Sequence, residues 1–194
     1  MNVLGFSGLA NGPFYREKYG LRVVGHDSSV ALVSDGRVAF AVEEGRLSRQ
    51  MHSSRLPVCA VRSALEFARL SWQDVDRLAY TWYASPARIA HMFTHHAFRV
   101  PLPYWPQLAL AGCRVIRDLM SPGRAARQFG AVLGCSLPPC EGVSHHMGHS
   151  ACAYFTSPFE HAAVLTVDGQ GEDESGSLGE WRGTAYRHFQ SISS

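Results

Sequence analysis

The sequence predicts an α/β fold, and three observations support this prediction. Two β-rich runs, 28–33 and 37–42, flank the turn SDGR, and Asp-Gly between such runs is a strong hairpin signal because Gly accepts a positive φ. A short apolar run at 2–8 precedes the hairpin and predicts a buried strand. Residues 56–71 follow with apolar side chains at helical spacing, and residues 77–82 are strand-like. The chain therefore begins with a β-β-β-α-β order of elements.

Two of these elements have further sequence support. Pro57 suits the first turn of the helix at 56–71, since a missing N–H costs nothing there. Residues 9–22 combine Gly, Pro and charged side chains and predict a loop between the first and second strands. We therefore expect three antiparallel strands at the start of the chain, with this loop between the first two.

The middle of the chain, at about 84–135, differs from the rest and predicts a helical insertion. The stretch VPLPYWP divides it into two expected helices. Its charge is strongly basic, with a single acid, Asp118, among these arginines: Arg88, Arg99, Arg114, Arg117, Arg124 and Arg127. Such a segment is either a solvated basic helix face or a surface for an anionic partner or substrate.

The last third of the chain predicts a helix followed by three strands. Residues 144–157 have small side chains along one side of the expected helix. Residues 161–167 form an apolar, β-branched run that ends at Asp168-Gly169, and two strands are expected within 176–194.

Composition excludes several classes of function. The chain has 194 residues, is 46% hydrophobic and carries a net charge of +2, so we expect a globular protein with no nucleic-acid partner. Its five cysteines form no CxxC motif, which favours a reducing cytoplasmic location over a disulfide framework. The N-terminus lacks the features of a signal peptide and no apolar run is long enough to span a membrane, so no membrane association is expected.

A histidine pair near the start of the expected 144–157 helix suggests a metal site. His145 and His149 are four residues apart and share one helix face, whereas His146 lies about 100° round the helix. A zinc protease would need Glu directly after the first histidine, where His146 stands. Asp168, at the end of a strand, completes a set of two histidines and one carboxylate that suits Fe(II) or Zn(II). The alternative is a structural Asp that begins the next turn.

Three other groups of residues are also candidates for functional roles. His91 and His95 are also four apart, with His96 adjacent, but no carboxylate follows them on a strand. His26-Asp27 at a strand entry either lines a pocket or serves turn chemistry. Three arginines after the third strand are candidates for phosphate or carboxylate contacts, with a solvated loop as the alternative: Arg46, Arg49 and Arg55.

Three ordered motifs carry a resemblance to a known family. They are HDSSVALVSDGRVAFAVEEGRLSRQMH (26–52), HHMGHSACAYF (145–155) and VLTVDGQGE (164–172). Their order and spacing resemble the O-carbamoyltransferases of antibiotic and nodulation-factor biosynthesis, of the tobramycin carbamoyltransferase type. The resemblance covers about 26–83 and 140–194, and the basic middle segment matches poorly.

The resemblance implies an actin-like ATPase, ribonuclease H-like fold, of which the chain holds an incomplete, N-terminal part over residues 1–194. It implies transfer of a carbamoyl group from carbamoyl-adenylate, made from carbamoyl phosphate and ATP, to a hydroxyl of a natural-product or sugar acceptor. The second half of this fold and a C-terminal adenylate-forming domain, in cis or in trans, are expected beyond these residues.

The resemblance also assigns roles to residues. His145, His149 and Asp168 take the positions of the iron ligands, Fe(II) or another divalent metal. His26 takes a position in the carbamoyl-adenylate pocket and is the candidate catalytic base. Arg46, Arg49 and Asp168 are expected to contact the bound cofactor or its phosphate.

The sequence departs from the family pattern at several positions. Gln50-Met51 replace two lysines, Gly45 replaces a Glu, and Ser150 replaces an Ala. Two other functions stay open: a truncated, non-catalytic module that binds a nucleotide or partner, and another actin-like ATPase or kinase. The latter would need a phosphate loop that the sequence does not display.

Overall fold

The computed structural model divides the chain into two units. It describes residues 1–9, 26–83, 85, 87, 89–90, 94, 101–106, 109, 113, 117, 121–169, 171 and 174–193. The first unit comprises Met1–Thr81 with Arg114–Gly142, and the second comprises Trp82–Cys113 with Val143–Ser194. Three predicted features lie outside the described residues: the loop at 10–22, the group His91, His95 and His96, and most of the basic segment.

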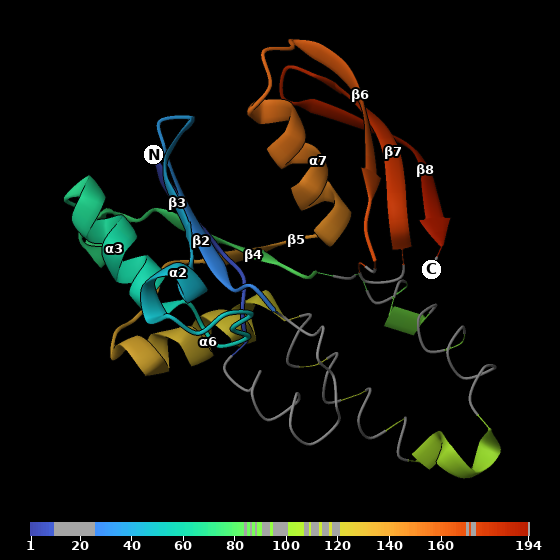
Figure 1. Cartoon of the computed structure of the whole chain (residues 1–194), viewed down its shortest axis with the longest axis horizontal. Coiled ribbons are helices and arrows are strands. Elements are labelled where there is room, and N and C mark those ends of the chain that lie inside the picture. The colour runs from blue at the N-terminus through green and yellow to red at the C-terminus, as the bar shows by residue number, and fades with distance from the viewer. Residues whose placement is uncertain are drawn as a thin grey trace. The chain divides into compact units, whose positions relative to one another are not determined.

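The first unit is built on a five-stranded sheet (Figure 1). In chain order its elements are β1 (Asn2–Phe6), β2 (Ser29–Ser34), β3 (Arg37–Glu43), α2 (Glu44–Ser48), α3 (Val58–Ala68), η1 (Trp72–Asp74), β4 (Arg77–Thr81), α6 (Pro122–Leu133) and β5 (Cys140–Val143). The strand order is β3-β2-β1-β4-β5, with β1–β2 and β2–β3 antiparallel and β1–β4 parallel. This confirms the expected antiparallel meander and the β-β-β-α-β order, and the structure adds that β4 pairs parallel to β1. The fold of this unit is α/β, as predicted.

The hairpin between β2 and β3 follows the turn chemistry of its sequence. Asp35 and Gly36 both adopt positive φ, 49° and 77°, as the two central residues of a type I′ turn require. The register closes on this turn, since Ser34 pairs with Arg37. The Asp-Gly signal therefore located the hairpin correctly.

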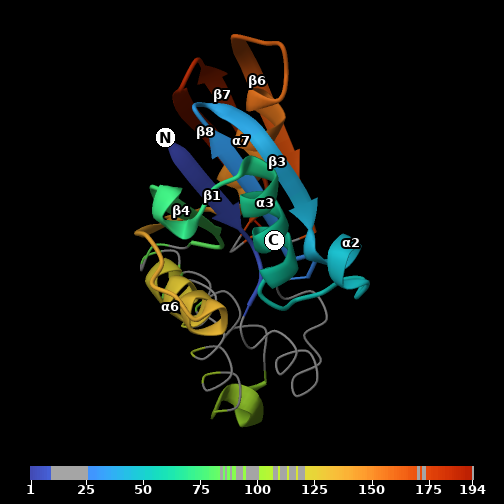
Figure 2. The same cartoon turned by 90° about the vertical axis from the view of Figure 1, so that its left-hand side faces the viewer.

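Alternate residues of the strands form the core of the first unit. Leu4 and Phe6 of β1 are buried on one face of the sheet. Phe6 contacts Phe129 of α6, with ring centroids 4.8 Å apart, and Phe40 of β3 contacts Phe67 of α3 at 5.3 Å. Phe40 lies on the same face as Leu4 through the cross-strand register, so α3 and α6 both cover this face. Figure 2 shows α3 in front of β1, β2 and β3.

Two elements of the first unit are absent from the sequence-based expectations. The short helix α2 follows β3 directly, within residues for which the sequence predicts no helix, and β5 has no alternating apolar pattern. The helix α6 lies within the expected insertion at about 84–135, yet it packs against the core of the first unit through Phe129. The insertion stays a prediction for the remaining residues of that range.

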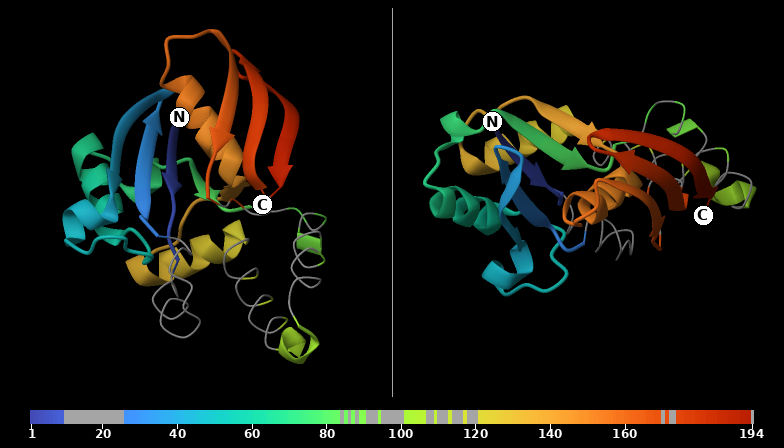
Figure 3. Two further views of the ribbon diagram at one scale, coloured as in Figure 1. Left: turned by 45° about the vertical axis from the view of Figure 1, so that its right-hand side comes forward. Right: turned by 90° about the horizontal axis from the view of Figure 1, so that it is seen from above.

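The second unit holds a helix against a three-stranded sheet. Its elements are η2 (Leu102–Tyr104), α7 (His145–Phe155), β6 (His161–Val167), β7 (Glu174–Arg182) and β8 (Ala185–Ser193). The strands run antiparallel in the order β6-β7-β8, and α7 lies against this sheet, as the left view of Figure 3 shows. The expected helix and its three following strands are confirmed.

Buried polar contacts join α7 to the sheet. The indole Nε1 of Trp181 on β7 donates to Ser150 Oγ at 2.8 Å, and the Trp181 ring stacks on Tyr154 with centroids 5.5 Å apart. Ser150, which departs from the Ala of the family pattern, thus has a partner of its own. Among the described residues, no helix is long and apolar enough to cross a membrane.

Candidate metal centre

The helix α7 places two histidines side by side. His145 is its first residue and His149 follows one turn later, so both imidazoles project from the same helix face. Ser144, with φ −64° and ψ 148°, is extended and ends the preceding segment. The N-terminal part of α7 therefore presents two imidazole nitrogens in the same direction.

The third group of the candidate site comes from the end of β6. Asp168 follows the last strand residue, Val167, and its backbone N–H donates to the Ser175 carbonyl at 2.9 Å. Its Oδ1 accepts from the Gly169 N–H at 2.6 Å. These two bonds fix the carboxylate so that its other oxygen, Oδ2, faces the histidines.

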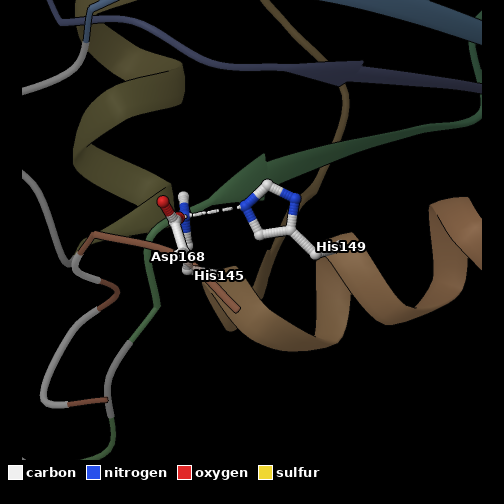
Figure 4. Close-up of side chains that lie close together, drawn as sticks. All are labelled: His145, His149 and Asp168. Atoms are coloured by element: carbon white, nitrogen blue, oxygen red, sulfur yellow. Dashed lines mark hydrogen bonds and ion pairs between the residues drawn. The ribbon is translucent and has the colours of Figure 1, made fainter. Parts of the chain in front are cut away.

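The three side chains converge on a small volume (Figure 4). Asp168 Oδ2 lies 2.6 Å from His145 Nε2 and 3.2 Å from His149 Nε2, and the two Nε2 atoms are 2.9 Å apart. Among the described residues, only His145, His149 and Asp168 form a set of three or more His, Cys, Asp or Glu ligand atoms able to hold one ion. The structure thus brings together the three residues that the sequence singled out. We call these three residues the triad.

The triad fits a divalent transition metal. Metal–nitrogen and metal–oxygen bonds of about 2.0–2.2 Å at tetrahedral or octahedral angles place neighbouring ligand atoms roughly 3.0–3.4 Å apart. The observed separations of 2.6–3.2 Å need only small side-chain movements to reach that range. Two imidazoles and one carboxylate suit Fe(II) or Zn(II) and leave other coordination positions open. The exposed fraction rises from 17% for His145 through 35% for Asp168 to 52% for His149, so small molecules can approach from the His149 side.

The electrostatics of the triad favour a charged carboxylate. Partial burial acts to raise the pKa of Asp168, but hydrogen bonds from His145 and the Gly169 amide, and the nearby histidine charges, outweigh it. The net result is a pKa below the usual value, so the carboxylate is ionised at neutral pH. An ionised carboxylate is the form that binds a metal.

His146 has a structural role beside the triad. Its ring is buried, with Nδ1 3.1 Å from Thr166 Oγ1 and Nε2 3.0 Å from the Glu174 carbonyl. Since a carbonyl only accepts, Nε2 of His146 carries a proton and donates it to the Glu174 carbonyl. His146, which lies about 100° round the helix from His145, therefore makes its contacts apart from the ligand pair.

His145 has one aromatic neighbour that the sequence does not predict. The Trp82 ring lies against His145, with centroids 4.6 Å apart and an interplanar angle of 39°. Trp82 has φ 75°, a backbone conformation that is rare for a bulky residue. No spacing rule relates positions 82 and 145, so only the fold could disclose this contact.

The remaining predicted site residues lie in the first unit. His26 Nδ1 lies 2.6 Å from Asp27 Oδ2. Arg46 forms an exposed ion pair with Glu43 at 3.4 Å, and Arg49 caps α2 in the left-handed conformation with φ 59°. The guanidinium groups of Arg46 and Arg49 therefore stay candidates for phosphate contacts.

Comparisons with known proteins place these observations in a family. The family model described as "Carbamoyltransferase N-terminus" matches residues 17–193. The nodulation protein NolNO of Sinorhizobium fredii is 35% identical over 164 residues, which cover 82% of this chain and 22% of that protein. An uncharacterized protein of Synechocystis sp. is 32% identical over 174 residues, 84% of this chain and 27% of its own. The chain thus spans about a quarter of the length of these two relatives.

Solved structures give a weaker likeness. YeaZ from Pseudomonas aeruginosa aligns with 99% of this chain and 67% of its own, at a TM-score of 0.45 and 17% identity.

Proposed function

Because the chain belongs to the carbamoyltransferase family, matching its N-terminal region, we propose that it serves carbamoyl transfer to a hydroxyl group. The donor is carbamoyl-adenylate, made from carbamoyl phosphate and ATP by an adenylate-forming domain in cis or in trans. The acceptor is a natural product or a sugar. Membership of the family supports carbamoyl transfer in general, and the donor and acceptor are part of the proposal.

The observation that carries this proposal is the convergence of the triad. His145, His149 and Asp168 would hold Fe(II) or another divalent metal through two nitrogens and one carboxylate oxygen. Bound there, the ion would supply Lewis-acid stabilisation of negative charge on donor oxygens. Asp168 contributes a carboxylate that is already ionised and oriented by its bond from Gly169.

The reaction itself requires one proton transfer and one leaving group. The acceptor oxygen bonds to the carbamoyl carbon, the bond from that carbon to the phosphate oxygen breaks, and AMP leaves. A base must take the hydroxyl proton, and we assign this role to His26 from its position in the first motif. Arg46 and Arg49 are assigned to the departing phosphate, whose geometry a guanidinium matches.

We expect His145→Ala to lower carbamoyl transfer at least about 100-fold, in the range that single electrostatic groups contribute to such reactions. The measurement uses the protein together with an adenylate-forming domain, in cis or in trans, and follows radiolabel from carbamoyl phosphate, with ATP and added Fe(II), into a panel of aminoglycoside and oligosaccharide acceptors. His161→Ala is the matched control, because His161 is an exposed histidine of the same unit that pairs with Glu180. Equal transfer by wild type and His145→Ala would contradict the proposed role of the triad.

A further inference from the structure

The first unit contains a second cluster of titratable side chains, in which one carboxylate joins two imidazoles. Asp27 Oδ2 lies 2.6 Å from His26 Nδ1, and Asp27 Oδ1 lies 3.0 Å from His52 Nδ1. The two histidines are 26 residues apart in the sequence. Each carboxylate oxygen is therefore used by a different ring.

The chemistry of these contacts fixes the protons of both rings. An ionised carboxylate only accepts hydrogen bonds, so each Nδ1 atom that faces it carries a proton. A neutral imidazole with a proton on Nδ1 has its lone pair on Nε2. The geometry thus leaves Nε2 of His26 as a proton acceptor.

We propose that Asp27 is a positioning residue that holds His26 in the tautomer with a free Nε2 lone pair, and that His52 shares and steadies the same carboxylate. This inference rests on the proposed function, in which His26 takes the acceptor proton. An acidic residue that orients a basic imidazole is a recurring arrangement in acyl-transfer sites. The ligand it serves is the hydroxyl group of the acceptor.

The backbone holds the two arms of the cluster together. Ser28 N–H donates to the Ser53 carbonyl at 2.9 Å, which ties the residue after Asp27 to the residue after His52. Leu9 N–H donates to the Ser54 carbonyl, also at 2.9 Å. Three segments of the first unit thus meet beside the cluster.

A glycine makes this close approach possible. Gly8 has φ 121°, and a Cβ at this position would lie 2.5 Å from the Arg55 carbonyl oxygen and 2.8 Å from Ser28 Cβ. Only glycine combines that backbone conformation with such close packing. The segment that follows His52 and the residue that follows Asp27 therefore both pack closely against Gly8.

The buried side chain of Glu44, the first residue of α2, holds the start of α3, so it connects the two sides of the segment that carries His52. Glu44 is only 5% exposed, and its oxygens accept from the Ala60 N–H at 2.8 Å and the Cys59 N–H at 3.3 Å. These N–H groups belong to the first turn of α3, where a helix offers them no carbonyl of its own. Glu44 N–H in turn donates to the Ser28 carbonyl at 2.8 Å. Glu44 therefore links the start of α3 to the residue beside Asp27.

Stability does not explain the cluster. Asp27 and His52 both adopt left-handed backbone conformations, with φ 55° and 52°. Such conformations are strained for a residue other than glycine. The side chains of His26 and His52 are 48% and 68% exposed, so their contacts with Asp27 contribute little to stability. Strain that is not repaid by stability is characteristic of functional sites.

The charge state of Asp27 agrees with this role. Partial burial acts to raise the pKa of Asp27, but the hydrogen bonds from His26 and His52, together with their charges, more than offset it. The resulting pKa lies below the usual value, so the carboxylate is ionised at neutral pH.

Nuclear magnetic resonance of the ¹⁵N-histidine-labelled protein tests the positioning contact without any activity assay. At about pH 8, long-range ¹H–¹⁵N spectra should show His26 and His52 with the proton on Nδ1. His26→Gln and His52→Gln assign the signals by their loss. In Asp27→Ala, His26 should shift toward the Nε2–H form. In Asp27→Asn, one ring should change tautomer, because the amide offers one acceptor and one donor.

Asp35→Ala is the matched control, since Asp35 is an exposed carboxylate of the same unit that pairs with the N-terminal amine. It should leave both tautomers unchanged. The proposal is overturned if His26 of the wild type carries its proton on Nε2, or if Asp27→Ala leaves the His26 tautomer as it was.

Kinetics of the active protein give the second readout. Asp27→Ala should lower kcat for carbamoyl transfer at least about 10-fold, a part of what a general base contributes, with KM for the acceptor nearly unchanged. Unchanged kcat would overturn the positioning role. Absence of carbamoyl transfer by the wild type would instead refute the proposed function, while the tautomer spectra would still decide whether Asp27 orients His26.

Discussion

His146→Ala is expected to lower the free energy of unfolding by about 3 kcal/mol, within the range for removing a large buried side chain and its hydrogen bonds. The ring is 2% exposed and joins α7 to Thr166 and to the Glu174 carbonyl. Its surroundings are tight, since a Cβ at Gly171 would lie 2.7 Å from the ring. The variant therefore leaves a cavity and removes the partner of two buried polar groups. Chemical denaturation of the metal-free protein measures the change.

The neighbouring ligand histidine provides the control for this prediction. His149 is 52% exposed, so His149→Ala should change the free energy of unfolding of the metal-free protein by less than about 1 kcal/mol. If His146→Ala and His149→Ala lowered the free energy of unfolding equally, the structural role of His146 would be contradicted.

His149→Ala is expected to weaken binding of Fe(II) or Zn(II) at least about 100-fold. It removes one of three protein ligands, and even loss of a group that merely supports a ligand costs about 10–100-fold in affinity. Titration of the apo protein with each metal, under anaerobic conditions for Fe(II), measures the dissociation constant. The effect should appear without loss of fold, because the exposed ring contributes little to packing.

A second exposed histidine of the same unit serves as the matched control for metal affinity. His161 lies at the start of β6 and pairs with Glu180, outside the triad. His161→Ala should bind metal like the wild type. Equal affinities of wild type and His149→Ala would exclude His149 as a ligand.

Local sequence signals predicted the regular parts of the fold. The Asp35-Gly36 turn, the apolar spacing of α3 and the strand that ends at Asp168 each depend on neighbouring residues, so they can be read directly from the chain. The polar strand β5 and the short helix α2 carry no such pattern. Their formation depends on pairing and packing with distant segments, such as the Glu44 contact to the start of α3.

The candidate site was predicted in part for the same reason. His145 and His149 share a helix face by spacing alone, and Asp168 is marked by its place at the end of a strand. The Trp82 contact with His145 and the bond between Asp27 and His52 join residues that are 63 and 25 positions apart. Both contacts arise from the tertiary structure, so the periodicity of the sequence does not predict them.

A crystal structure of the metal-loaded protein will decide whether the triad binds a divalent metal. Diffraction data collected on both sides of the metal absorption edge locate the ion from its anomalous signal. We predict one peak about 2.0–2.2 Å from Nε2 of His145, Nε2 of His149 and a carboxylate oxygen of Asp168. A fully loaded crystal without a peak at these three side chains, or with the peak on other residues, would contradict the account.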